Sequence, residues 1–95
     1  MKVVWSARAL RDLDELAVYI ASDSMKSAER VEARIHREAV LLSEFPQGGR
    51  AGRVPGTRER IVGRTPCILV YRADSIQVRI VRILRGARKW LRNFT

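Results

Sequence analysis

Apolar residues in the first half of the chain recur at the spacing of one helix face in two stretches. The first stretch follows Lys2–Trp5, a strand-like run of β-branched and aromatic residues, and it starts at Ser6, a favourable N-cap residue. Small polar residues interrupt the pattern at 23–27, and it resumes at Ala28. Pro46 ends the second stretch, because proline disfavours the helical conformation of the residue before it. The pattern predicts a strand and two antiparallel helices, with apolar stripes of Leu10, Leu13, Ala17 and Ile20, then Val31, Ile35, Ala39 and Leu42.

Apolar and polar residues alternate in the second half of the chain, as is typical of β-strands. The alternating runs lie at residues 59–62, 67–72 and 76–84, and short turn-forming segments between them predict two hairpins. In the last run the apolar phase changes after Ile80. Either this strand is buried on both faces, or a β-bulge near Ile80 resets its register.

Glycine, proline and arginine dominate residues 46–58, and this composition predicts a mobile basic loop between the second helix and the strands. The loop does not separate two domains, because neither side of it could form a core of its own. A chain of 95 residues lies near the lower end of the domain range, so we expect one domain over residues 1–95. The predicted fold class is α+β, with a helical hairpin packed on a mainly antiparallel sheet.

Positive charge is concentrated in the second half of the chain. Residues 1–47 contain 7 Lys and Arg against 8 Asp and Glu, whereas residues 48–95 contain 12 against 2. Arginine outnumbers lysine 16 to 3, which favours planar, bidentate contacts with phosphate or carboxylate groups. The second half is therefore expected to bind an acidic partner, either a nucleic acid or an acidic protein.

Few side chains are suited to catalysis. His36, the only histidine, falls among charged residues in the second predicted helix, where we expect a solvated structural role. Cys67, the only cysteine, lies in an apolar run and is expected in the core. One cysteine and one histidine give no zinc-binding spacing, so neither a metal nor another cofactor is expected. A lone cysteine fits a reducing compartment and no apolar run is long enough for a membrane span, so the cytoplasm is the expected location.

Arginines are especially frequent on and beside the predicted strands. Converging guanidinium groups could stabilise a phosphorane-like transition state, as in an RNA-cleaving enzyme, or they could simply bind an acidic surface. Acid–base chemistry needs a titrating group, and besides arginine and lysine the nearby candidates are Tyr71, Glu59 and Asp74. Binding is therefore favoured over catalysis. The cluster comprises Arg58, Arg60, Arg64, Arg72, Arg79, Arg82, Arg85, Arg88 and Arg92.

Short motifs follow one another in a recognisable order along nearly the whole chain. They include Trp5-Ser6, Asp12-Leu13, Tyr19-Ile20-Ala21, Phe45-Pro46, Gly48 to Arg50, Gly56-Thr57-Arg58-Glu59, Val70-Tyr71-Arg72 and Leu84-Arg85-Gly86-Ala87-Arg88-Lys89-Trp90. In these motifs the chain resembles the RelE/ParE superfamily of bacterial toxins, and most of all its ParE branch. The resemblance implies a β-α-α-β-β-β fold and a small antitoxin whose C-terminal segment wraps the toxin's groove and neutralises it. ParE-like members inhibit DNA gyrase, whereas RelE-like members cut mRNA in the ribosomal A site.

The C-terminal motif distinguishes the two branches. The ribonuclease branch tends to have a histidine or a second basic group where Arg85 stands, and a tyrosine or histidine near Trp90. An indole cannot exchange the proton that such a mechanism needs, so this departure argues against mRNA cleavage. Arg58 and Arg82 correspond roughly to basic positions of the ribonucleases, and no catalytic residue is carried over.

The resemblance therefore predicts a ParE-like toxin that binds and inhibits DNA gyrase and is neutralised by a cognate antitoxin, a protein-binding inhibitor rather than an enzyme. The residues expected to contact the target are Arg58, Arg82, Arg85, Arg88 and Trp90. A ribosome-dependent mRNA endonuclease with an arginine-based site is the alternative. A basic nucleic-acid-binding domain is a third possibility, since the positive charge of the second half would also bind the phosphate backbone of a nucleic acid.

Overall fold

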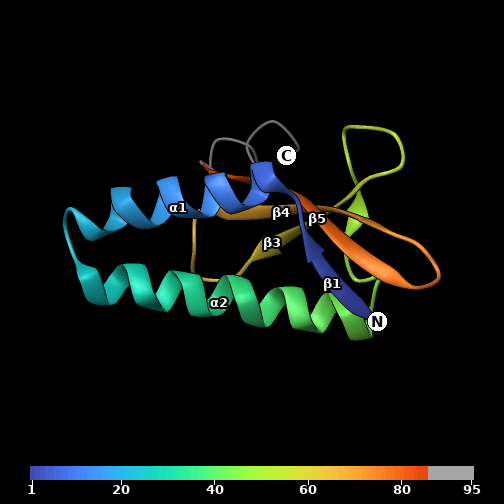
Figure 1. The fold of residues 1–95 in the computed structure, drawn as a ribbon, viewed down its shortest axis with the longest axis horizontal. Coiled ribbons are helices and arrows are strands. Elements are labelled where there is room, and N and C mark those ends of the chain that lie inside the picture. The colour runs from blue at the N-terminus through green and yellow to red at the C-terminus, as the bar shows by residue number, and fades with distance from the viewer. Residues whose placement is uncertain (86–95) are drawn as a thin grey trace.

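The computed structural model describes residues 1–85 and shows two helices packed against one face of a five-stranded sheet (Figure 1). The elements are β1 (Lys2–Trp5), α1 (Ala7–Ala21), α2 (Met25–Glu44), β2 (Arg50–Ala51), β3 (Arg58–Val62), β4 (Cys67–Ala73) and β5 (Gln77–Leu84). The strand order is β1-β5-β4-β3-β2, with β1 parallel to β5 and every other pair antiparallel. The predicted α+β fold, a helical hairpin on a mainly antiparallel sheet, is confirmed.

Serine side chains cap the start of both helices. The Ser6 hydroxyl accepts a hydrogen bond from the Ala9 N–H at 3.0 Å, as expected for the N-cap of α1. The second cap, Ser24, lies within the polar residues 23–27, and α2 starts directly after it, before the apolar stripe resumes at Ala28. The polar residues that interrupt the apolar pattern are thus a cap and the first helical turn. As predicted, α2 ends just before Pro46.

The core lies between the two helices and the sheet. Tyr71 lies at the centre of this core and is 0% exposed. Its hydroxyl donates a hydrogen bond to the Pro46 carbonyl at 2.9 Å and accepts one from the Gly49 N–H at 2.7 Å. The predicted stripe of α1 needs one correction, because Leu10 is 48% exposed and Leu16 points inward instead. The core cluster includes Ala9, Leu13, Leu16, Ile35, Ala39, Leu42, Val62, Cys67, Leu69, Tyr71, Val78, Ile80 and Ile83.

The segment predicted as a mobile basic loop contains a fifth strand. Within residues 46–58, Arg50 and Ala51 form β2 and pair with Glu59 and Arg58 of β3. Glu59 is 5% exposed, and its Oε2 accepts a hydrogen bond from the Arg53 backbone N–H at 3.0 Å. The loop prediction was therefore wrong for β2, because a strand of two residues is too short to leave an alternating pattern between glycines.

The predicted β-bulge is present in β5. Tyr71 of β4 pairs with Ile80 and Val70 pairs with Arg82, so Val81 is the extra residue of the bulged strand. The bulge shifts the inward-facing positions by one residue, from Val78 and Ile80 before it to Ile83 after it. The phase change read from the sequence is thus a change of register.

The sheet has a second face, directed away from the helices, which we call the outer face. Successive residues of a strand point to opposite faces, and Tyr71 points to the helices. Val70 and Arg72 therefore belong to the outer face of β4, as does Arg79, the partner of Arg72 on β5. Val70 is buried, whereas Arg72 and Arg79 are exposed.

Candidate functional site

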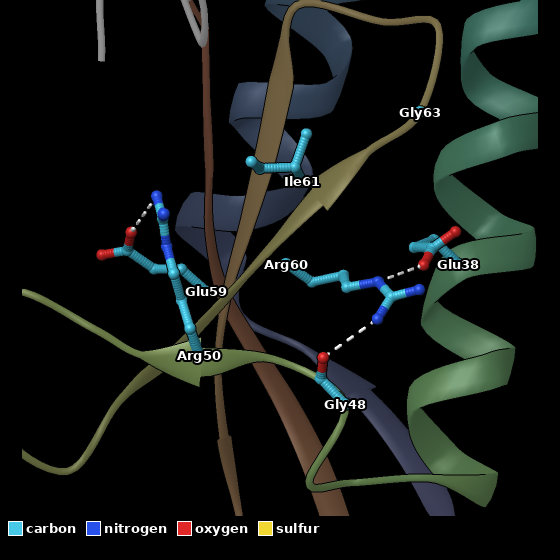
Figure 2. Close-up of a pocket in the computed structure, with 7 residues that line it drawn as sticks. All are labelled: Glu38, Gly48, Arg50, Glu59, Arg60, Ile61 and Gly63. Atoms are coloured by element: carbon cyan, nitrogen blue, oxygen red, sulfur yellow. Dashed lines mark hydrogen bonds and ion pairs between the residues drawn. The ribbon is translucent and has the colours of Figure 1, made fainter. Parts of the chain in front are cut away.

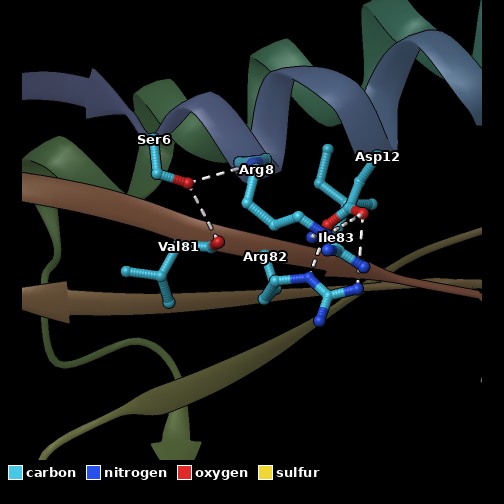
Figure 3. Close-up of polar contacts among 7 residues, drawn as sticks. Ser6, Arg8, Asp12, Val81, Arg82 and Ile83 are labelled. Atoms are coloured by element: carbon cyan, nitrogen blue, oxygen red, sulfur yellow. Dashed lines mark hydrogen bonds and ion pairs between the residues drawn. The ribbon is translucent and has the colours of Figure 1, made fainter.

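A buried carboxylate on α1 connects this helix to the last strand (Figure 3). Asp12 is 8% exposed, and its Oδ2 accepts hydrogen bonds from Arg82 Nε at 2.8 Å and from the Ile83 backbone N–H at 2.9 Å. Its Oδ1 lies 3.3 Å from Arg82 Nη2 and 3.4 Å from Arg8 Nε. Burial alone would raise the pKa of Asp12, but the hydrogen bonds from Arg82 and Ile83 and the charges of Arg82 and Arg8 outweigh it and lower the pKa. Asp12 is therefore an anion that fixes the guanidinium of Arg82.

The same junction completes the hydrogen bonds of an open strand edge. β1 ends at Trp5, so within residues 1–85 the second part of β5 has no neighbouring strand on that side. The Ser6 N–H donates to the Ile80 carbonyl at 2.9 Å, and the Ser6 hydroxyl donates to the Val81 carbonyl at 3.0 Å (Figure 3). Asp12 accepts a hydrogen bond from the N–H of Ile83, two residues after Val81. The start of α1 thus takes the place of a neighbouring strand and protects this edge from pairing with another chain.

The residues predicted to contact the target occupy separate places. Arg58 donates through Nη1 to the Gly49 carbonyl at 2.9 Å and through Nη2 to the Gln47 side-chain oxygen. Arg85 lies just after β5, with its guanidinium carbon 5.2 Å from the centroid of the Tyr19 ring. The other two, Arg88 and Trp90, lie outside the described residues.

Arg58 and Arg82 are held by different parts of the fold. The guanidinium of Arg58 binds the segment before β2, whereas the guanidinium of Arg82 binds the carboxylate of Asp12 on α1. The structure therefore does not gather the described members of the predicted set into one arginine cluster.

Two open cavities, of about 460 and 500 Å³, meet at Tyr19 and Arg85. Tyr19 is 68% exposed, so its ring and hydroxyl are accessible on the surface of α1 beside Arg85. The remaining lining residues are Leu16, Ile20 and Pro66 in one cavity and Asp14, Glu15 and Val18 in the other. This surface combines apolar, cationic and anionic groups, and the sequence pattern alone gave no indication that Tyr19 would contact Arg85.

A third cavity, of about 490 Å³, lies between the second half of α2 and β3, and we call it the α2–β3 groove (Figure 2). Arg60 crosses it, with Nε 2.6 Å from Glu38 Oε1 on α2 and Nη1 2.9 Å from the Gly48 carbonyl. On the far side of β3, Arg50 Nη2 lies 4.0 Å from Glu59 Oε1. The lining residues are Glu38, Gly48, Arg50, Glu59, Arg60, Ile61 and Gly63.

Apolar side chains continue the α2–β3 groove along α2. A smaller cavity of about 180 Å³ shares Glu38, Gly48 and Arg60 with the groove and adds Leu41, Leu42 and Phe45 to the lining. Phe45 is 65% exposed and Leu41 is 41% exposed. Exposed apolar residues beside paired charges are typical of a protein-binding surface. From the sequence, Phe45 indicated only the end of a helix, because its exposure depends on where α2 meets the sheet.

Two side chains considered for chemistry have the predicted structural roles. His36 is exposed on α2, and its ring lies 5.2 Å from the Trp5 ring, centroid to centroid. Cys67 is 0% exposed, and burial raises the pKa of its thiol. Within residues 1–85 no group of three or more histidine, cysteine, aspartate or glutamate residues is arranged to hold a metal ion. In the same part of the chain, neither helix is both long and apolar enough to span a membrane.

Comparisons with known proteins give consistent results. A family model described as the ParE toxin of the type II toxin-antitoxin system parDE matches residues 3–90. The chain is 39% identical over 89 residues to Y4kP of Sinorhizobium fredii, a protein named as a toxin. This match covers 94% of this chain and 92% of that protein. It is also 39% identical over 87 residues to toxin RelE2 of Caulobacter vibrioides, and this match covers 92% of this chain and 97% of that protein. A solved structure of the chromosomal ParDE system from P. aeruginosa is similar, with a TM-score of 0.78, 28% identity, and coverage of 90% of this chain and 95% of that chain.

Proposed function

Because this chain belongs to the ParE toxin family of type II toxin-antitoxin systems, we propose that it inhibits DNA gyrase in the cytoplasm and is neutralised by a cognate antitoxin. The family itself implies the antitoxin partner. The proposal that gyrase is the target is more specific than the proposal of an antitoxin partner, and it rests on the match to the ParE model over residues 3–90. The protein acts in this proposal by binding, without a chemical step of its own.

The contacts of the arginines support binding over RNA cleavage. Arg82 is held by the carboxylate of Asp12, and Arg58 is held by the Gly49 carbonyl and by Gln47. Both correspond roughly to basic positions of the ribonucleases, and they are held by separate parts of the fold. A phosphoryl-transfer site needs charges that converge on one reacting group, so this separation disfavours a site built from the pair.

The decisive experiment compares the two targets with one preparation of the protein. Purified toxin is added to gyrase and relaxed plasmid, and in parallel to a translation extract with a labelled mRNA. We expect supercoiling to be inhibited and the ribosome-bound mRNA to remain intact. Codon-specific cleavage with normal supercoiling would instead establish the ribonuclease.

Target contact is proposed for the residues predicted from the sequence, with Arg85, Arg88 and Trp90 as the centre. Tryptophan and arginine are over-represented among residues whose truncation weakens protein interfaces by more than about 2 kcal/mol. The variants Arg85→Ala, Arg88→Ala and Trp90→Ala are expected to stay folded, to retain antitoxin binding and to lose growth arrest. Full toxicity of all three folded variants would place the contact surface elsewhere, with the arginines of residues 50–60 as the next candidates.

A ribosome-dependent mRNA endonuclease is the second candidate. The relative from Caulobacter vibrioides carries the name toxin RelE2, and Arg85 lies against the exposed Tyr19 with Asp14 and Glu15 lining the same cavity. A tyrosine hydroxyl and a carboxylate can exchange protons, and a guanidinium can stabilise a phosphorane-like transition state. If the extract shows cleavage, Tyr19→Phe should abolish it while leaving the fold intact, because the Tyr19 ring is largely exposed.

The α2–β3 groove is the proposed antitoxin site. Phe45, Leu41 and Ile61 supply apolar positions, and Arg60 lies at the rim within an ion pair to Glu38. An amphipathic helix with leucine or isoleucine on one face and carboxylates beside it would bury the apolar residues and meet the arginines. Apolar anchors dominate the energy of such an interface, so its affinity should fall only modestly as salt increases. A loss of several decades in affinity with salt would contradict this assignment.

A further inference from the structure

Two arginines face each other across the outer face of the β4–β5 hairpin. The strand register places Arg72 directly opposite Arg79, and both side chains are exposed. The hairpin projects beyond the ends of both helices (Figure 1). Like charges at directly opposed positions of an antiparallel pair destabilise the sheet, so this arrangement calls for a compensating anion.

No carboxylate within residues 1–85 forms an ion pair with either arginine. The ion-paired arginines in this part of the chain include Arg8, Arg50, Arg60 and Arg82. Asp74, the acidic residue of the hairpin turn, accepts hydrogen bonds from the Ile76 and Gln77 N–H groups at 2.8 and 2.9 Å. Its carboxylate stabilises the turn, and it does not neutralise the arginine pair.

The guanidinium of Arg72 lies against the loop between β2 and β3, where a glycine leaves room for it. Its Nη1 lies 3.4 Å from the Pro55 carbonyl, and a Cβ atom added at Gly56 would lie 2.7 Å from the same nitrogen. Gly56 also has a φ of +84°, which favours glycine. Beneath the pair, Tyr71 and Ile80 are 0% exposed and anchor the two strands. The arginines are therefore presented from a fixed backbone.

The surroundings of the pair favour phosphate over a protein partner. A protein interface needs apolar anchors at its centre, and the α2–β3 groove has them in Phe45 and Leu41. The Arg72–Arg79 row instead ends at the half-buried Val4, the partner of Arg79 on β1. The exposed apolar residues nearest to it in the chain, Ile76 and Val54, lie in the hairpin turn and in the neighbouring loop rather than in the row itself. Arginines at two directly opposed strand positions can each donate to the oxygens of a phosphate, and the net charge of +9 attracts a polyanion from a distance.

We propose that Arg72 and Arg79 bind the phosphate backbone of a nucleic acid. This binding site goes beyond gyrase inhibition and requires neither gyrase nor the antitoxin. A duplex DNA and a single-stranded RNA share the phosphate chemistry and serve as the two probes. The proposal and the proposed function can therefore succeed or fail separately.

The experiment measures the affinity of the purified protein for fluorescein-labelled nucleic acid as salt is raised. Each neutralised phosphate contributes about 0.9 to the slope of log affinity against log salt for duplex DNA. Arg72→Gln and Arg79→Gln should each lower that slope by about 0.9. Between about 50 and about 200 mM salt, the wild type should then lose about 3.5-fold more affinity than either variant. The probe that the wild type binds more tightly identifies the preferred nucleic acid.

Arg37→Gln is the matched control, because Arg37 is exposed on α2 and its loss changes the net charge equally. We expect the control to keep the wild-type slope. An equal fall of the slope in the control would show that net charge alone binds the probe, and would overturn the proposal. Unchanged binding in Arg72→Gln and Arg79→Gln would do the same. Labelled polyglutamate binding as tightly as the nucleic acids would assign the pair to an acidic protein.

Discussion

Asp12 and Arg82 are 70 positions apart in the chain, yet Arg82 Nε donates to Asp12 Oδ2 across 2.8 Å and so connects the first helix to the last strand. The same carboxylate accepts from the Ile83 N–H at the open edge of β5. One side chain thus neutralises an arginine and completes the hydrogen bonds of a strand. A single change at this position tests how much the junction contributes to the fold.

Asp12→Asn should lower the free energy of unfolding by about 2 kcal/mol, because hydrogen bonds to a charged group are lost at a nearly buried site. Urea unfolding at neutral pH measures the difference. Asp14→Asn is the control, since Asp14 is exposed on the same helix and its substitution should change stability by less than about 0.5 kcal/mol. Equal stability of the two variants would show that the junction is not a determinant of the fold.

The stabilisation by Asp12 should depend on pH in the acidic range. Its pKa is lowered in the folded state, so the folded protein favours the anion more than the unfolded chain does. The contribution is fully present above the unfolded value of about 3.9 and is lost as pH falls through the lowered folded pKa. The stability difference between the wild type and Asp12→Asn should therefore shrink below about pH 4. A difference that stays constant from neutral pH to about pH 2 would rule out this ionisation as the cause.

Gly49→Ala should destabilise the protein by about 1 to 3 kcal/mol, because overpacking a closed site forces neighbouring groups apart. An added Cβ would lie 2.6 Å from the Tyr71 hydroxyl oxygen and 2.9 Å from the Glu59 carbonyl. Thermal unfolding measures the loss. Gly63→Ala is the matched control, because an added Cβ there meets no atom within 4 Å. Similar melting temperatures for both variants would contradict the close approach at Gly49.

Local patterns in the sequence were sufficient to predict most of the fold. The spacing of apolar residues predicted both helices, and the phase change after Ile80 predicted the bulge that the register places at Val81. These features depend on neighbours in the chain, so a single sequence carries them. The polar residues 23–27 interrupt the apolar stripe and also contain the cap Ser24 and the first turn of α2.

The candidate site was predicted less completely, because it depends on contacts between distant residues. The sequence indicated many arginines near the strands, but their faces follow from the register, which the bulge changes. Arg58 binds the Gly49 carbonyl and Gln47, whereas Arg82 binds Asp12 on α1, so within residues 1–85 the two arginines have no common partner. Asp12 is one of several acidic residues in α1, and nothing in its neighbours marks it as the partner of Arg82.

Phe45→Ala should weaken antitoxin binding at the α2–β3 groove without unfolding the protein. Phe45 is 65% exposed, so its removal takes little apolar surface from the core, whereas an exposed aromatic anchor commonly contributes about 2 kcal/mol or more to an interface. That energy corresponds to a decrease in affinity of about 30-fold. Binding of the purified antitoxin is measured by titration calorimetry, with thermal unfolding of each variant as the check on the fold.

Val54→Ala is the matched control for Phe45→Ala, because Val54 is 54% exposed but lies in the loop between β2 and β3, outside the lining of the α2–β3 groove. We expect the control to bind the antitoxin with the wild-type affinity. Equal weakening in both variants would indicate a general loss of apolar surface. Wild-type affinity in folded Phe45→Ala would exclude the groove as the antitoxin site and direct attention to the cavities around Tyr19 and Arg85, which also combine exposed apolar surface with an arginine.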